Sequence, residues 1–183
     1  MRFFISALLL LLSACATAPT PRATHYRHHP RTQVPAPLPP VIKFYSRSQA
    51  FGEFSNFALF PILLEGRWWP TSEHYYQAMK YQRGDWQEWV RAVADPMEAA
   101  NRGRDPQKPK RSDWSSYRDE VMRKALRAKF TQHQELRELL LATGEARLVE
   151  HTEKDCYWAD CGDGRGENKL GLMLEELRQE LRP

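Results

Sequence analysis

The stretch W-W-P-T-S-E-H-Y-Y-Q-A-M-K-Y, residues 68–81, decides the fold, because it joins a helix-start signal to acidic, basic and amide side chains. Pro70, followed by either Thr71 or Ser72, is typical of the first turn of a helix, where a hydroxyl accepts a free backbone N–H. Glu73 then falls in that first turn. We expect a helix to begin here and the rest of the domain to pack around it.

The side chains of this helix fall into two neighbouring stripes. With 3.6 residues per turn, one stripe carries groups able to hold a ligand: Glu73, Tyr76, Gln77 and Lys80. The adjacent stripe carries His74, Ala78 and Tyr81. A helix that faced only solvent or only a core would not need an acid, an amide and an amine beside so many aromatic rings. We interpret the helix as the wall of a pocket.

Composition limits the rest of the chain. Its 183 residues allow one ordinary domain with appendages, and 42% apolar residues with six Trp, seven Tyr and eight Phe are enough for a core. The net charge of +4 comes from the first forty residues, which hold four arginines and no acid. From Val41 onward 23 basic residues balance 23 acidic ones. A neutral domain lacks the basic surface of a nucleic-acid-binding protein, so no nucleic-acid partner is expected.

The N-terminal residues predict a targeting segment. Residues 1–14 combine an early arginine with the apolar run Phe3–Leu12, which is too short to span a bilayer as a mature helix, and small residues precede Cys15. This pattern is typical of a bacterial lipoprotein signal, with lipid attached to Cys15 as a membrane anchor. Because Ala16 is not the aspartate that favours retention in the inner membrane, we expect the periplasmic face of the outer membrane. The alternative is a start assigned too far upstream in a cytoplasmic protein.

Residues 15–40 predict an extended tether. They contain seven of the 13 prolines and no apolar periodicity. Three histidines, at positions 25, 28 and 29, lie in this segment without a carboxylate partner, so a solvated linker is favoured over a metal site. We predict neither a metal nor a cofactor for this protein.

Residues 41–183 predict a single helix-rich α+β domain with a few short strands, mostly early. Strand patterns are expected at 41–45 and in a hairpin of 60–64 with 67–68, and Val149 marks a further edge strand. After the helix that opens near residue 72, further helices are expected at 85–93, 95–101, 114–130, 134–141 and 167–181. The absence of an alternating strand-helix rhythm favours α+β over a parallel α/β fold.

A second informative stretch is D-C-Y-W-A-D-C-G-D-G-R-G-E-N-K-L-G, residues 155–171. Its glycines permit sharp turns and a close approach to a ligand, and Asp155 and Asn168 place polar groups around Trp158. The spacing matches neither a dinucleotide fingerprint nor a P-loop. A calcium loop is disfavoured because the closing glutamate is absent and Arg165 lies inside the loop.

Five motifs, taken in order, resemble one known family. They are W-P-T-S-E-H-Y-Y-Q-A-M-K (69–80), G-R-D (103–105), V-M-R-K-A-L-R-A-K-F-T-Q-H (121–133), L-V-E-H-T-E-K-D (148–155) and Y-W-A-D-C-G-D-G-R-G-E-N-K-L-G (157–171). They are similar to the YbiA-like, or NADAR, family, and the likeness runs from Val41 to Arg182. The resemblance implies an N-glycosidase that cleaves a ribose phosphate from an aminopyrimidine in early riboflavin intermediates. Relatives act on ADP-ribose linked to a nucleobase.

The chain departs from the family pattern in one loop and in its expected location. Where the family usually has W-G-D-G-G after the tryptophan, this chain has Ala159 and Cys161. Riboflavin intermediates are cytosolic, so a lipid-anchored member would act on another ribosylated small molecule. Cys156 and Cys161 either bridge across the loop or stay free, and the sequence leaves both alternatives open.

The chemistry of N-glycoside cleavage assigns the expected roles. Breaking the C–N bond builds positive charge on the sugar and negative charge on the leaving nitrogen, so the site needs a carboxylate near C1, a proton source and a positioned water. Glu73 and Asp155 are the expected carboxylates, with their division of labour left open, and His74 is either an acid or a core histidine. The expected substrate-binding residues are Trp69, Gln77, Lys80, Arg104, Trp158 and Asn168.

Four of these six residues have a specific chemical reason. Lys80 and Arg104 suit a phosphate, Trp158 suits stacking on the base, and Asn168 suits either ribose hydroxyls or the main chain. The competing class is a module that binds ADP-ribose or an NAD derivative without turnover, and a purely structural envelope protein is the third. Substrate identity and oligomeric state do not follow from the sequence.

Overall fold

The computed structural model describes residues 40–183. The expected signal segment 1–14, its lipidation site Cys15 and all but the last residue of the 15–40 tether lie outside the described residues. No helix within the described part of the chain combines the length and apolar character needed to cross a membrane.

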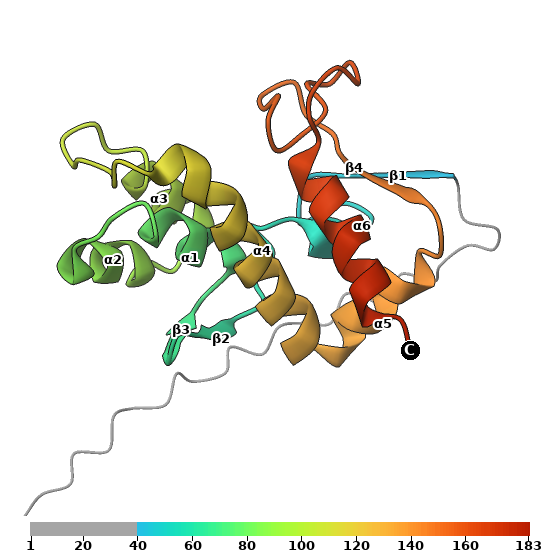
Figure 1. Cartoon of the computed structure of the whole chain (residues 1–183), viewed down its shortest axis with the longest axis horizontal. Coiled ribbons are helices and arrows are strands. Elements are labelled where there is room, and N and C mark those ends of the chain that lie inside the picture. The colour runs from blue at the N-terminus through green and yellow to red at the C-terminus, as the bar shows by residue number, and fades with distance from the viewer. Residues whose placement is uncertain (1–39) are drawn as a thin grey trace, which may run out of the picture. The chain divides into compact units, whose positions relative to one another are not determined.

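The described chain has the expected α+β fold, with two small sheets and a majority of helix (Figure 1). The strands are β1 (Val41–Phe44), β2 (Ile62–Leu64), β3 (Arg67–Trp69) and β4 (Arg147–Glu150). A 3-10 helix, η1 (Gly52–Phe54), precedes the α-helices α1 (Ser72–Ala78), α2 (Gly84–Arg91), α3 (Pro96–Arg102), α4 (Trp114–Gln132), α5 (Gln134–Ala142) and α6 (Lys169–Leu181). The structure therefore confirms the expected helices after α1, with ends displaced by at most two residues, whereas α1 ends at Ala78, so Lys80 and Tyr81 of the expected stripes lie beyond it.

The expected hairpin is the antiparallel pair β2 and β3, in which Ile62 lies opposite Trp69. Its two turn residues, Glu65 and Gly66, have φ angles of 54° and 73°. Positive φ at both positions matches the right-handed twist of a two-residue hairpin. The hairpin leads directly into α1.

The other sheet joins the two ends of the domain. β1 pairs with β4 in parallel, with Ile42 opposite Leu148 and Phe44 opposite Glu150. The expected strand around Val149 is thus confirmed as β4. Ile42, Phe44 and Leu148 are buried, so one face of this two-stranded sheet covers the core.

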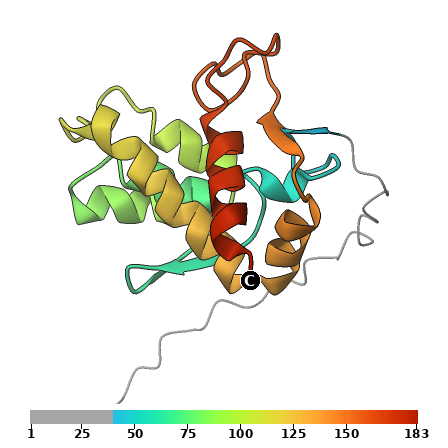
Figure 2. The same cartoon turned by 45° about the vertical axis from the view of Figure 1, so that its right-hand side comes forward.

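Helix α1 is enclosed by other elements. Every residue from Thr71 to Tyr81 is buried, and α1 contacts α2, α3, α4 and β3. Figures 1 and 2 show α1, α2 and α3 on one side of the long α4, with α5 and α6 on the other. Of the two hydroxyls considered for the cap, Thr71 is the one used, because its side chain accepts the N–H of His74.

A buried lysine links the core to the start of α1. Lys129, on α4, is fully buried and donates to the carbonyls of Glu53 and Ser55. Burial lowers the pKa of Lys129 to about 7. Directly after Ser55 in sequence, the carbonyl of Asn56 accepts the N–H of Glu73 at 3.2 Å. The loop before the hairpin therefore fixes the backbone of Glu73.

Candidate active site

Glu73 lies in the first turn of α1 with 4% of its surface exposed. Gln77, one turn later, donates from Nε2 to Oε1 of Glu73 at 2.6 Å. Burial raises the pKa of the Glu73 carboxyl, whereas that hydrogen bond and the nearby charges of Lys80 and Arg104 act to lower it. The negative charge of Asp155 raises it again. Residues far apart in sequence therefore meet at this carboxyl.

Gln77 also presents an unused acceptor. Its Oε1 is buried and has no hydrogen-bond partner within residues 40–183. The place of Gln77 depends on Gly103, because a Cβ at position 103 would lie 1.9 Å from that Oε1. Buried polar atoms are nearly always paired in native proteins, so this unpaired oxygen beside Glu73 is an exception.

Three basic side chains, Lys80, Arg104 and Lys110, lie in the neighbourhood of Glu73. Lys80 is 8% exposed, and its Nζ lies 5.3 Å from the ring centre of Tyr76 and 5.8 Å from that of Trp114. Burial lowers the pKa of Lys80 to about 8 despite the opposing effect of Glu73, and the nearby charges of Lys110 and Arg104 also lower it. None of these three cations makes an ion pair with another residue in the described range. Unpaired cations beside a buried acid suit a phosphate, and Lys110 is one that the sequence did not single out.

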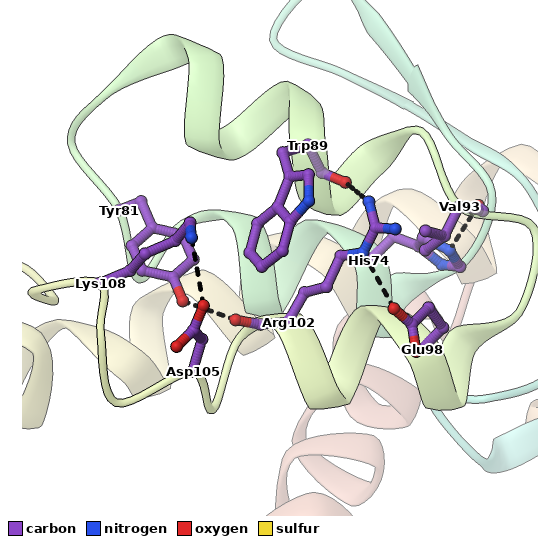
Figure 3. A network of polar contacts seen from close by, with 8 residues as sticks. All are labelled: His74, Tyr81, Trp89, Val93, Glu98, Arg102, Asp105 and Lys108. Atoms are coloured by element: carbon purple, nitrogen blue, oxygen red, sulfur yellow. Dashed lines mark hydrogen bonds and ion pairs between the residues drawn. The ribbon is translucent and has the colours of Figure 1, made fainter.

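A network of polar contacts fixes the turn that carries Arg104 (Figure 3). Tyr81 donates from its hydroxyl to the carbonyl of Arg102 at 2.6 Å. The Arg102 guanidinium in turn donates to the carbonyl of Trp89, also at 2.6 Å. Two ion pairs complete the network, Arg102 with Glu98 and Lys108 with Asp105, both at 3.1 Å.

Two residues expected at the site belong to the core. His74 is fully buried, with Nδ1 2.8 Å from the Thr71 hydroxyl and Nε2 3.1 Å from the carbonyl of Val93 (Figure 3). Burial lowers its pKa to about 4. With both ring nitrogens occupied, it fits the core alternative rather than an acid. Trp69 is 1% exposed and donates to the carbonyl of Leu64, so the expectation of substrate binding is corrected: its ring packs inside the hairpin.

The loop between β4 and α6 brings Asp155 toward α1. One oxygen of Asp155 accepts the backbone N–H groups of Tyr157 and Trp158, both at 2.8 Å. The ring of Trp158 lies edge-on to that of Tyr76, with 5.4 Å between centres. The structure thus places Trp158 against the helix of Glu73, and Asp155 lies three residues before it in the same loop. The two expected carboxylates lie within electrostatic reach of each other.

Asn168, at the start of α6, contacts the main chain. Its Nδ2 donates to the carbonyl of Leu148 at 2.8 Å, and its Oδ1 accepts the N–H of Glu150 at 2.9 Å. It adopts φ 50°, a left-handed conformation that asparagine tolerates better than most residues. Of the two alternatives considered, ribose or main chain, the structure shows the main-chain contact.

Glu150 is a third carboxyl that sequence reasoning missed. It ends β4, and because side chains alternate along a strand it points to the same side as the buried Leu148. Burial, followed by the negative charges of Asp155, Glu73 and Asp160, raises its pKa to about 8. The sequence did contain a signal for Glu150, namely an acid at the core-facing position of the strand pattern L-V-E-H.

A disulfide between Cys156 and Cys161 closes the stretch that carries Trp158. Cys161 has φ 64°, which explains why glycine is usual at this position of the family loop. Ala159, the other departure, is fully buried. Within residues 40–183 no group of three or more histidine, cysteine or acidic side chains could hold a metal ion.

Comparison with known proteins identifies the relatives of this chain. Residues 43–182 match the NADAR domain. The chain is 57% identical over 141 residues to N-glycosidase YbiA of Escherichia coli strain K12, covering 77% of this chain and 88% of that protein. It is 38% identical over 145 residues to an N-glycosidase of Nostoc punctiforme, covering 78% of this chain and 93% of the relative.

Two further comparisons extend this result. A riboflavin biosynthesis protein of Vibrio vulnificus is 44% identical over 140 residues, which cover 76% of this chain and 38% of that longer protein. The NMR structure of E. coli YbiA superimposes with a TM-score of 0.72, covering 77% of this chain and 84% of that one at 57% identity. The fold described above is therefore the fold of these relatives.

Proposed function

Because this chain belongs to the NADAR family, we propose that it is an N-glycosidase that hydrolyses the bond between a ribose phosphate and a nucleobase-like group, as in early riboflavin intermediates. Its relatives in E. coli and Nostoc punctiforme are named N-glycosidases. The observation that carries the proposal is that the loop before α6 lies against α1 through Trp158 and Tyr76, with Asp155 near enough for its negative charge to raise the pKa of the Glu73 carboxyl. Two carboxylates on one sugar are what C–N cleavage requires.

The two carboxylates divide the work at the anomeric carbon. As the C1–N bond lengthens, positive charge spreads over C1 and the ring oxygen, and a nearby carboxylate stabilises it. The other carboxylate takes a proton from the attacking water. Glu73 is our first candidate for the water, because Gln77 orients one of its oxygens. Asp155 then faces the sugar through the oxygen that its backbone hydrogen bonds leave free.

The surrounding groups fit the rest of such a substrate. Lys80, Arg104 and Lys110 form an unpaired cationic group that suits the phosphate. Trp158 and Tyr76 offer aromatic surface for the base. The free Oε1 of Gln77 can accept an N–H from the exocyclic amino group of an aminopyrimidine.

The experiment that tests this proposal measures release of free base. The purified protein is incubated separately with a ribosylated aminopyrimidine 5′-phosphate, with NAD and with ADP-ribosylated guanosine. Release of base from the first substrate supports the proposal and identifies the substrate class. Tight binding of ADP-ribose without any release would instead identify a binding module.

We also propose that the protein is anchored in the cell envelope through Cys15, with a ribosylated substrate found there. The support is the pattern of residues 1–15, an early arginine, an apolar run and a cysteine after small residues. Metabolic labelling with a fatty-acid analogue tests it. The wild type should be labelled and fractionate with membranes, and Cys15→Ser should lose both properties; a soluble, unlabelled wild type would refute the anchor.

A further inference from the structure

The loop between β4 and α6 contains a covalent bond to which no role has been assigned, the disulfide between Cys156 and Cys161. The two cysteines are five positions apart, and the segment that they close begins directly after Asp155 and contains Trp158. Cys156 is exposed, so a reductant in solution can reach the bond. Two residues expected at the site therefore lie inside or directly beside the closed segment.

Asp155 is hydrogen-bonded to both parts of that segment. One oxygen of its side chain accepts the N–H groups of Tyr157 and Trp158, both at 2.8 Å. Its backbone carbonyl accepts the N–H of Cys161 at 3.2 Å. Trp158 in turn lies edge-on to Tyr76, with 5.4 Å between ring centres. A change in the backbone of Cys161 therefore reaches Asp155 through one hydrogen bond.

Cys161 has a backbone conformation that most side chains disfavour. Its φ is 64°, in the left-handed region that glycine enters readily and other residues rarely occupy. The bond to Cys156 holds the side chain of Cys161 in place, and a broken bond leaves the residue free to return to a negative φ. That rotation would carry its N–H away from the carbonyl of Asp155. The disulfide therefore secures a turn that the backbone of a cysteine does not favour.

We propose that the Cys156–Cys161 disulfide positions Asp155 and Trp158 for catalysis, so that the enzyme is fully active only while this bond is intact. The inference rests on the proposed N-glycosidase function. A dithiol reductant breaks the bond by exchange: one thiolate attacks the Cys156 sulfur, and the Cys161 sulfur leaves and takes up a proton. The second thiolate of the reductant then displaces the Cys156 sulfur, which is protonated in turn. The reductant ends as a disulfide and the protein as a dithiol.

This role connects the site with a compartment. Structural disulfides persist in oxidising surroundings such as the periplasm, whereas the cytoplasm keeps thiols reduced. The lipoprotein pattern of residues 1–15 leads to the same oxidising surroundings. The loop would therefore be held in its active form where the anchor is proposed to keep the protein.

The first test compares the purified protein before and after reduction with dithiothreitol, using a ribosylated aminopyrimidine 5′-phosphate. Reduction should expose two additional thiols to iodoacetamide. It should also lower kcat about 10-fold, because Asp155 is no longer held in place, and reoxidation should restore the activity. Equal kcat in the oxidised and the reduced protein would overturn the inference and leave the proposed function intact. No release of base by either form would refute the proposed function instead.

Two variants separate the disulfide from the conformation that it secures. Cys156→Ser leaves Cys161 unbridged and should show the low kcat of the reduced wild type. Adding Cys161→Gly supplies a residue that adopts positive φ unaided, so kcat should return close to the oxidised wild-type value and no longer respond to dithiothreitol. Wild-type kcat in Cys156→Ser, or no recovery in the double variant, would contradict the role given to Cys161.

Amide hydrogen exchange tests the same loop without turnover. In the oxidised protein the N–H groups of Tyr157 and Trp158 are bonded to Asp155, and reduction should speed their exchange about 10-fold. The N–H of Met79, bonded to the carbonyl of Tyr75, is the internal control and should not change. Exchange at Tyr157 and Trp158 that is the same in both forms would overturn the inference, whether or not the protein releases base.

Discussion

The two halves of the site are held in place by different means. Glu73 sits on a helix whose every residue is buried, fixed by a hydrogen bond to Gln77 and by the packing of three other helices. Asp155 sits in a loop of turns, fixed by backbone N–H groups and closed by the Cys156–Cys161 disulfide. The helical half is therefore held by packing in the core, and the loop half by local hydrogen bonds and a disulfide.

The largest effect should come from the helical half. Glu73→Gln removes the charge but occupies nearly the same volume, so the fold should persist while kcat falls roughly 1,000-fold. Ligand affinity, measured by calorimetry with ribose 5-phosphate, should change little. A variant that keeps wild-type kcat would remove Glu73 from the mechanism.

The buried histidine of the same helix gives a stability prediction. The pKa of His74 falls from 6.5 to about 4 on folding, so the native state favours the neutral ring. Its contribution is complete above pH 6.5 and is lost as the pH falls toward 4, by roughly 3 kcal/mol in the free energy of unfolding. Denaturant unfolding between pH 7 and 4.5 measures this loss.

One histidine variant tests this prediction. His74→Asn should flatten the dependence of unfolding free energy on pH. Equal slopes in the wild type and in His74→Asn would contradict burial of a neutral ring.

In the loop half the matching change is Asp155→Asn. The amide oxygen can still accept from Tyr157 and Trp158, so the turn should persist while the charge is lost. We expect a fall in kcat of about 100-fold, smaller than for Glu73 because the loop carboxyl is less buried. Asp163→Asn, an exposed loop acid paired only with Arg165, is the control and should keep full activity.

The smallest expected effect tests the support behind Glu73. Gly103→Ala would push Gln77 away from the acid, and we expect kcat to fall about 10-fold and the melting temperature to fall as well, because the added Cβ also lies 2.8 Å from the Cβ of the buried Gln77. Gly84→Ala, where an added Cβ meets nothing within 4 Å, is the matched control. Equal activity of the two variants would show that the Gln77 contact does not position Glu73.

The difference between the helix of Glu73 and the loop of Asp155 also explains which parts of the site could be predicted from the sequence. The helix containing Glu73 follows local rules, a capping hydroxyl followed by a regular repeat, and its start was predicted correctly. Periodicity does not reveal which side of a fully enclosed helix faces a ligand, so His74 was considered for the site although it contacts the core.

The loop half depends on contacts between distant residues, which local patterns do not encode. The pKa of Glu150 is raised partly by the charges of Asp155 and Glu73, and Asn168 accepts a hydrogen bond from β4 although the two residues are 18 positions apart in sequence. Lys110 comes near Lys80 only because of the path that the chain takes after α3, and no local pattern in the sequence predicts that path. The positive φ of Cys161 gives the reason for glycine in the family pattern at this position, and the sequence alone does not show that φ.

The central claim is that Glu73 and Asp155 act on one sugar carbon. A crystal structure of the Glu73→Gln protein with an uncleaved ribosylated aminopyrimidine 5′-phosphate tests it most directly. We predict that C1 of the ribose lies between the side chain at position 73 and the Asp155 carboxylate, with the phosphate beside Lys80. A ribose bound with C1 remote from either side chain would contradict the account.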